Sequence, residues 1–259
     1  MPESNGKYVE VNGINMYYEV YGSGAHLILL HRGGGSGLFN WGEYIPMLSE
    51  HFQVLIPDSR GHGKTNNPSR ELSYQLLGDD FALFIQTLSP EKPMICGWSD
   101  GGQIALKLGM KELELGAMVI GGAYYSFEQL NVEAFKSIGL EEAGKVNFEY
   151  LQEAVPDYVE IWEKVHDNWQ DLIVDISYLW FTPFEDTPED FGRISTHAIV
   201  LLGDRDEFIP VEEAVKMFRM LPNGELAIIP GANHSLSRTK INEFSSIVLE
   251  FLLRHSSSD

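Results

Sequence analysis

This chain of 259 residues has one cysteine, Cys96, and no apolar run that approaches the length of a membrane span. A single cysteine excludes an intrachain disulfide framework and a cysteine-based zinc site. Its place in an apolar segment predicts an inert, buried thiol, so redox chemistry is not expected. The N-terminus lacks the basic start and apolar stretch of a secretion signal. We therefore expect a soluble cytoplasmic protein.

Positive charge is also scarce, because 18 Lys and Arg residues stand against 38 Asp and Glu residues, for a formal net charge of -20 at pH 7. The resulting field repels nucleic acid, anionic membranes and polyanionic substrates. We expect a neutral or cationic small-molecule substrate, no nucleic-acid partner and no membrane partner. The alternative is that the acidic surface serves only solubility. The sequence does not indicate the oligomeric state.

The order of the apolar segments predicts an α/β fold with a mostly parallel, eight-stranded sheet covered by helices on both faces. Two alternating segments joined by the tight-turn dipeptide Asn12-Gly13 open the chain as an antiparallel edge. Later apolar runs alternate with helical stretches, as in parallel sheets. Strands are expected at 8–11, 14–20, 27–30, 54–57, 94–96, 118–120, 199–202 and 226–229, and helices at 41–51, 74–88, 103–110, 211–221 and 241–254.

This alternation stops between Tyr124 and Arg193, where the sequence becomes acidic, aromatic and helical in its spacing. We interpret residues 124–193 as a helical cap inserted into a single core made of residues 1–123 and 194–259. An amphipathic stretch from Tyr158 to Val165 is expected to bury one face against the core and could line a pocket.

A serine lies between glycines in the run Ile-Cys-Gly-Trp-Ser-Asp-Gly-Gly, which ends at Gly102. The run falls where a strand is expected to turn directly into a helix, which is the sequence form of a nucleophile elbow. The turn strains the serine, and Gly97 and Gly101 let neighbouring backbone pass closely. The pentapeptide alone is only suggestive, but its position predicts Ser99 as a nucleophile.

A serine hydroxyl needs a base and a carboxylate that orients the base. The loop 203–210 follows an apolar strand and therefore lies at the sheet edge where parallel sheets place their sites. We predict Asp206 as the orienting acid. Asp204 and Glu207 are alternatives. Each of the three could instead have the structural role of capping the helix that begins near Val211.

The base is predicted to be His234, in the small-residue loop 230–236 that follows the last apolar strand. Of the other histidines, only His31 and His62 lie on loops at the same edge. A lone histidine is usually structural, but one that follows a serine elbow and an acid loop in this order fits a catalytic base.

Charge on a reacting carbonyl oxygen needs preorganised donors, usually two backbone N–H groups. The N–H of Asp100, directly after the nucleophile, is predicted as one donor. The second is expected from the glycine-rich loop 31–37, with Gly33 as first choice and Gly34 as second. A phosphate-binding loop is disfavoured, because the Lys-Ser/Thr ending of nucleotide-binding P-loops is missing.

These motifs together resemble the α/β-hydrolase superfamily over nearly the whole chain, and the order Ser99, Asp206, His234 matches that family's order. The chain is most similar to its small capped esterase, lactonase and cofactor-free haloperoxidase group. The segment 58–64 resembles the family's structural turn after the fourth strand. Two residues depart from the pattern: Arg32 replaces a usual glycine, and Lys64 stands where serine is common.

Two further residues are assigned to the substrate pocket. Arg32 could narrow the pocket, point to solvent or place a cation near a carbonyl or carboxylate, and our hypothesis is that it shapes substrate choice. A solvated arginine on a permissive loop is the alternative. Trp98 either touches the pocket or packs beneath the serine turn.

The motifs and the resemblance predict a serine hydrolase that cleaves a small, mainly apolar carboxylic ester or lactone through an acyl-enzyme, with no metal and no cofactor. Perhydrolysis or halogenation through a peracid, and carbon–carbon bond hydrolysis, use the same three residues and remain alternatives. A ligand-binding receptor on the same fold is the alternative from another class of protein.

Overall fold

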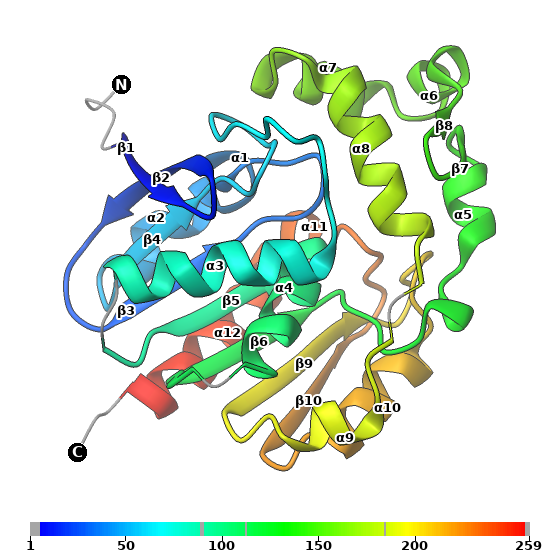
Figure 1. Cartoon of the computed structure of the whole chain (residues 1–259). Helices are drawn as coiled ribbons and strands as arrows, with labels where there is room; N and C mark the ends of the chain where they lie inside the picture. Colours follow the sequence, from blue (N-terminus) through cyan, green and yellow to red (C-terminus); the bar gives the residue numbers. More distant parts are fainter. Residues whose placement is uncertain (1–5, 89–90, 112, 184, 257–259) are drawn as a thin grey trace.

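The computed structural model describes residues 6–88, 91–111, 113–183 and 185–256 (Figure 1). Its centre is an eight-stranded sheet with the strand order β1-β2-β4-β3-β5-β6-β9-β10, which confirms the expected fold class. The strands are β1 (Gly6–Val11), β2 (Ile14–Tyr21), β3 (His26–Leu30), β4 (Gln53–Pro57), β5 (Met94–Trp98), β6 (Ala117–Gly121), β9 (His197–Gly203) and β10 (Gly224–Ile229).

The sheet begins antiparallel and continues parallel. Strands β1 and β2 form a hairpin around Asn12 and Gly13, whose φ angles of 46° and 75° suit a tight turn. Strand β2 also runs antiparallel to β4, and every later pair in the sheet is parallel. All residues of β5 and β6 are buried, as expected for strands covered on both faces. Cys96 lies in β5, and burial raises the pKa of its thiol.

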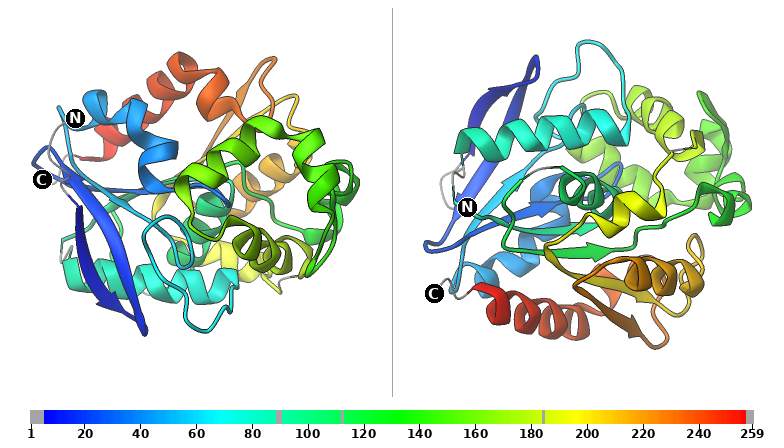
Figure 2. Two further views of the ribbon diagram at one scale, coloured as in Figure 1. Left: turned by 90° about the horizontal axis from the view of Figure 1, so that it is seen from above. Right: turned by 60° about the horizontal axis from the view of Figure 1, so that its bottom comes forward.

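Helices cover both faces of the sheet (Figures 1 and 2). One apolar cluster joins the sheet to α3 (Tyr74–Leu88), α4 (Asp100–Gly109) and α10 (Val211–Met220). A second cluster, on the other face, contains residues of α1 (Gly37–Trp41) and α12 (Ile241–Ser256). The short helix α11 (Leu236–Thr239) precedes α12. In the part of the chain that the structure describes, none of the helices has the length and apolar character needed to cross a membrane.

Two predicted helices differ from the structure by more than two residues at one end or are broken, and two others, α10 and α12, differ by one or two residues at their C-terminal ends. The helix expected at 41–51 is three short pieces, α1, a 3-10 turn η1 (Gly42–Tyr44) and α2 (Ile45–Leu48). Pro46 lies at the start of α2, where its missing N–H is tolerated, so the chain restarts a helix there instead of continuing one. Helix α4 begins at Asp100 rather than Gln103, because Gly101 and Gly102 of the serine turn are already helical.

The segment between β6 and β9, residues 122–196, is called the insertion. It contains η2 (Phe127–Gln129), α5 (Val132–Lys136), α6 (Phe148–Ala154), α7 (Pro156–Val165), α8 (Trp169–Phe181) and α9 (Pro188–Gly192). It also contains a small hairpin, β7 (Leu140–Glu142) with β8 (Lys145–Val146), that the sequence did not predict. The two strands of this hairpin are too short and contain too few apolar residues to give an alternating pattern.

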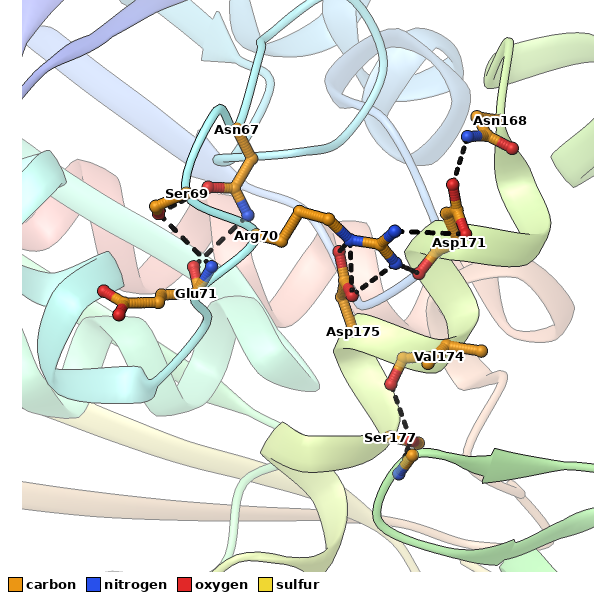
Figure 3. A network of polar contacts seen from close by, with 10 residues as sticks. Asn67, Ser69, Arg70, Glu71, Asn168, Asp171, Val174, Asp175 and Ser177 are labelled. Carbon is orange, nitrogen blue, oxygen red and sulfur yellow. Dashed lines mark hydrogen bonds and ion pairs between the residues drawn. The ribbon is translucent and has the colours of Figure 1, made fainter.

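Polar and apolar contacts join the insertion to the core. Arg70, in the loop between β4 and α3, forms ion pairs with Asp171 at 3.3 Å and Asp175 at 2.9 Å on α8 (Figure 3). Exposed pairs of this kind contribute little to stability. Ile173 and Ile176 of the same helix are almost fully buried in the first apolar cluster, and full burial of such a side chain contributes about 1.5–3 kcal/mol.

Three buried histidines fix the glycine-rich loop after β3. The N–H of Gly34 donates to His62 Nε2 at 3.2 Å, and the carbonyl of Gly34 accepts from His166 Nε2 at 2.9 Å. His31 Nε2 accepts the N–H of Ser59 at 2.8 Å. His166 belongs to the insertion and the others to the core, so the loop is bound from both sides. His31 and His62 accept through Nε2, which requires neutral rings.

This arrangement predicts acid-sensitive stability. Burial lowers the pKa of His31 to about 4 and also lowers the pKa values of His62 and His166. Below the ordinary histidine pKa of about 6.5, the unfolded chain takes up protons that the folded chain refuses. The stabilisation is therefore complete above pH ~6.5 and is lost as the pH falls toward about 4, with His31 accounting for ~3 kcal/mol.

The measurement is urea unfolding of the wild type and of His31→Gln at several pH values between 7.5 and 4. Glutamine offers a non-titrating amide in place of the imidazole, so the variant should lose less unfolding free energy over this range than the wild type. Equal losses in both proteins would show that His31 does not titrate as described.

Candidate active site

The backbone at Ser99 is strained. Strand β5 ends at Trp98 and α4 begins at Asp100, which leaves Ser99 alone in the turn with φ 57° and ψ -119°. A non-glycine residue pays about 1–3 kcal/mol for such a conformation. A Cβ on Gly97 would lie 2.0 Å from the Gly101 carbonyl oxygen, and a Cβ on Gly101 would lie 2.1 Å from that of Leu30. The two glycines therefore permit the close backbone contacts that hold the turn.

The structure brings the three predicted residues together in one hydrogen-bonded chain. Ser99 Oγ lies 3.0 Å from His234 Nε2, and His234 Nδ1 lies 2.7 Å from Asp206 Oδ2. Asp206 follows β9 and His234 follows β10, so both are placed by parallel strands that end at the same sheet edge as β5. The other oxygen of Asp206 accepts the N–H groups of Phe208 and Ile209, each at 3.0 Å, which fixes the carboxylate.

The two alternative acids bind backbone instead. Asp204 Oδ1 accepts the N–H of Gly231 at 2.5 Å. Glu207 Oε2 accepts the N–H of His234 at 3.0 Å, so it holds the main chain of the histidine rather than its ring. Asp206 is therefore the acid that the structure places on the imidazole.

The surroundings of His234 favour its charged form. Burial lowers the pKa of the imidazole, but the charge and hydrogen bond of Asp206 outweigh burial, and the pKa is raised. When a histidine takes a proton from a serine it becomes an imidazolium. A neighbouring carboxylate such as Asp206 stabilises that charged form. The rival histidines His31 and His62 belong to the buried cluster that holds the glycine-rich loop.

The predicted oxyanion donors lie beside the serine. Gly33 and Asp100 both line the cavity that contains Ser99. Asp100 is the first residue of α4, where an N–H has no acceptor within the helix. Within the described residues the Gly33 N–H also has no acceptor. The N–H of Gly34, the second choice, donates to His62 and is engaged away from the serine.

The side chain of Asp100 is a feature that the sequence did not reveal. Its carboxylate is buried and accepts from Tyr74 Oη at 2.8 Å and from Trp180 Nε1 at 3.0 Å. Burial raises the pKa of this carboxyl group, although both hydrogen bonds act in the opposite direction. A Cβ on Gly33 would lie 2.2 Å from Asp100 Oδ2, so the carboxyl group packs directly against the glycine loop. The only signal was an acidic residue directly after the nucleophile.

Ser99 and His234 open into a cavity of about 270 Å³ between the core and the insertion. Most of its wall is apolar or aromatic, and the insertion contributes Gly122, Tyr124, Leu130, Ala134, Phe135, Ser137, Ile138, Leu140, Val155, Tyr158, Trp162 and Trp180. The sequence indicated an aromatic segment, but its spacing could not identify which aromatic residues face the serine. A pocket of this kind suits a small, mainly apolar ligand.

Two residues separate this cavity from an outer groove of about 630 Å³. Tyr158 and Ser235 line both spaces, and their hydroxyl groups are 2.7 Å apart. Tyr158 belongs to α7 of the insertion, and Ser235 directly follows His234 in the core. Their hydrogen bond therefore joins the insertion to the loop that carries the predicted base.

The two residues assigned to the pocket have different positions. Arg32 lines the cavity and is buried. Trp98 is not among the lining residues, which corrects its assignment to the pocket. Its indole is 1% exposed and packs in the second apolar cluster, and its Nε1 donates to the carbonyl of His234 at 3.1 Å. Alternation along β5 sends Trp98 to the face of the sheet away from the cavity.

Lys64, the other departure from the family pattern, lies at the surface of the core rather than in the cavity. Its Nζ donates to Tyr17 Oη at 3.0 Å and lies 4.2 Å from the centre of that ring. Within the described part of the chain, no three His, Cys, Asp or Glu side chains are arranged to hold a metal ion.

Two known proteins match this chain over most of its length. A 2-hydroxy-6-oxo-6-(2'-aminophenyl)hexa-2,4-dienoic acid hydrolase of Metapseudomonas resinovorans is 25% identical, over 96% of this chain and 91% of the relative. The serine hydrolase BPHL of Homo sapiens is 26% identical, over 94% and 85%.

Among solved structures, a mutant of the meta-cleavage product hydrolase CumD from Pseudomonas fluorescens IP01, complexed with acetates, superposes with a TM-score of 0.82 at 20% identity. The match covers 96% of this chain and 98% of that one. The model of the alpha/beta hydrolase family matches residues 27–239, which include the serine turn and both following loops. This chain belongs to the alpha/beta hydrolase family.

Proposed function

We propose that this protein is a serine hydrolase that cleaves a small, mainly apolar carboxylic ester or lactone. One observation carries the proposal: the hydrogen-bonded chain from Ser99 through His234 to Asp206 opens into a small and mainly apolar cavity. The base is within reach of the nucleophile and is itself oriented by a buried carboxylate, which is the arrangement that activates a serine.

In the proposed mechanism, Ser99 Oγ attacks the carbonyl carbon while His234 Nε2 accepts the hydroxyl proton. The backbone N–H groups of Gly33 and Asp100 stabilise the negative charge on the carbonyl oxygen. The imidazolium, stabilised by Asp206, then donates its proton to the leaving alcohol, and an acyl-enzyme remains. His234 next takes a proton from water as the resulting hydroxide attacks the acyl group. The imidazolium then returns that proton to Ser99 Oγ as the bond between the acyl carbon and Oγ breaks, which releases the carboxylic acid.

We further propose that residues 124–193 act as a cap on the core formed by residues 1–123 and 194–259. The contribution of the insertion to the cavity wall supports this, as does the bond between Tyr158 and Ser235. A cap of this kind excludes bulk water and strengthens the electrostatic interactions at the serine.

Carbon–carbon bond hydrolysis is a second candidate, because the relative from Metapseudomonas resinovorans is named for an oxo-dienoic acid rather than an ester. A ketone flanked by a labile carbon–carbon bond can be attacked by the same serine. Hydrolysis of oxo-dienoic acids without hydrolysis of any ester would favour this candidate.

Replacement of the nucleophile tests the proposal. Ser99→Ala should lower kcat on p-nitrophenyl esters and small lactones by about 10⁶, because the attacking group is removed. A serine-directed phosphonate should add once to the wild type and not to the variant, as measured by mass spectrometry. Asp204→Asn is the matched control, since Asp204 lies on the acid loop but binds the backbone of Gly231 rather than the imidazole. Undiminished turnover in Ser99→Ala would contradict the assignment.

The raised pKa of His234 predicts the pH profile. The base works only when deprotonated, so kcat/KM should rise with pH and reach half its maximum above pH ~6.5, the ordinary value for histidine. Asp206→Asn removes the group that raises this pKa, so the midpoint should move down and the rate should fall by about 10⁴. Steady-state rates between pH 5 and 9 test this, and an unchanged midpoint in Asp206→Asn would exclude Asp206 as the orienting acid.

A further inference from the structure

The guanidinium of Arg32 is buried in the wall of the cavity that contains Ser99. The residue exposes 9% of its surface and lies directly before Gly33, the predicted oxyanion donor. Its side chain extends between two rings, with the guanidinium carbon 4.8 Å from the centre of Tyr158 and 5.6 Å from that of Phe39. Arg32 therefore neither points to solvent nor lies on a surface loop.

This buried cation has no acidic partner. Its Nη1 donates to Tyr158 Oη at 3.2 Å. With the Asn40 amide oriented so that its nitrogen donates to the Ser36 carbonyl, the Nε of Arg32 donates to the Asn40 oxygen at 3.2 Å. Among the described residues it forms no ion pair, and three of its five N–H groups have no protein acceptor. Contacts with aromatic faces offset only part of the free energy lost when a charge leaves water.

The phenol of Tyr158 lies in the field of this cation. Burial raises the pKa of Tyr158, but the charge of Arg32 and the hydrogen bonds from Ser235 and Arg32 outweigh it, and the pKa is lowered. Asp100, the buried acid of the cavity, is engaged by Tyr74 and Trp180 instead. The positive site is thus local, in a chain whose net charge is -20.

We propose that Arg32, with the hydroxyl of Tyr158, forms a subsite for a carboxylate of the substrate. The substrate is then a short ester or lactone that carries a free carboxylate in addition to the bond that is cleaved. This inference rests on the proposed serine hydrolase function, because it assigns the carboxylate to the molecule that Ser99 attacks.

A carboxylate fits this site better than other groups. The planar guanidinium donates two parallel hydrogen bonds to a carboxylate, and such charge-assisted pairs are short and directional. The cavity of about 270 Å³ is otherwise mainly apolar, so the segment between the ester and the carboxylate is a short hydrocarbon chain. A neutral ester of the same length would leave the guanidinium N–H groups without a partner.

The test compares acids with amides of the same shape. Monomethyl succinate, glutarate and adipate place the carboxylate on the acyl side, and O-acetyl glycolate and O-acetyl 3-hydroxypropanoate place it on the alcohol side. The matching carboxamides are neutral controls. In the wild type, the kcat/KM of at least one acid should exceed that of its amide by about tenfold to a hundredfold, mainly through a lower KM.

Three variants identify the group responsible. Arg32→Met keeps an unbranched side chain and should abolish this preference, whereas Arg32→Lys keeps the charge without the planar fork and should retain part of it. Arg238→Met is the matched control, because Arg238 stacks on the same Phe39 ring at 5.1 Å but does not line the cavity with Ser99. It should keep the wild-type ratio. Thermal melting of each variant verifies folding.

Calorimetric titration of Ser99→Ala with the same acids and amides measures binding without turnover. Acid-selective binding that disappears in the Ser99→Ala, Arg32→Met double variant supports the subsite even if the wild type hydrolyses no ester, a result that would overturn only the proposed hydrolase function. The subsite would be overturned if the wild type hydrolysed acids and amides with equal kcat/KM and Ser99→Ala bound both equally. A preference for acids that survives in Arg32→Met would also overturn it.

Discussion

The strained conformation of Ser99 depends on close packing of three neighbouring strands of backbone. Its N–H donates to the carbonyl of Gly121 in β6 at 2.8 Å, and Gly101 packs against the carbonyl of Leu30 in β3. The serine is thus held by both strands that flank β5. Because parallel strands end at a common edge, the same strand order also delivers the loops after β3, β9 and β10 to this point. The positions of the base, the acid and the glycine loop all follow from the packing around this turn.

The sequence predicted those parts of the molecule that local pattern determines. Buried parallel strands read as short apolar runs, and the serine, acid and histidine loops each follow one of them, so the order of the loops indicated their meeting place. The stretch from Tyr158 to Val165 was expected to line a pocket, but the contacts of Tyr158, of the Asp100 side chain and of the histidines around Gly34 were not predicted, because their partners lie far away in the sequence. The helix expected at 41–51 shows the same limit of local pattern. Its apolar residues keep a helical spacing, although the structure has three short helical pieces there.

Net charge and local charge give different expectations for the substrate. The overall charge of -20 indicates repulsion of polyanions at long range, where salt screens the field within about 8–10 Å. Inside the cavity the nearest groups dominate, namely the guanidinium of Arg32 and the carboxylates of Asp100 and Glu207, of which Asp100 is engaged by Tyr74 and Trp180. A small monoanion experiences mainly these near groups, whereas a polyanion experiences the whole surface. The proposed carboxylate subsite therefore departs from the neutral or cationic substrate that the net charge led us to expect, because that expectation considered only the long-range field.

The single thiol of the chain has a practical consequence. Cys96 is fully buried within β5, and burial raises the pKa of its thiol, so the folded protein offers no accessible thiolate to an alkylating dye. Cysteines introduced at exposed positions become the only labelling sites without any prior removal of the native thiol. A pair of fluorophores, one on α7 and one on the core, makes the distance between the insertion and the core directly observable in single molecules.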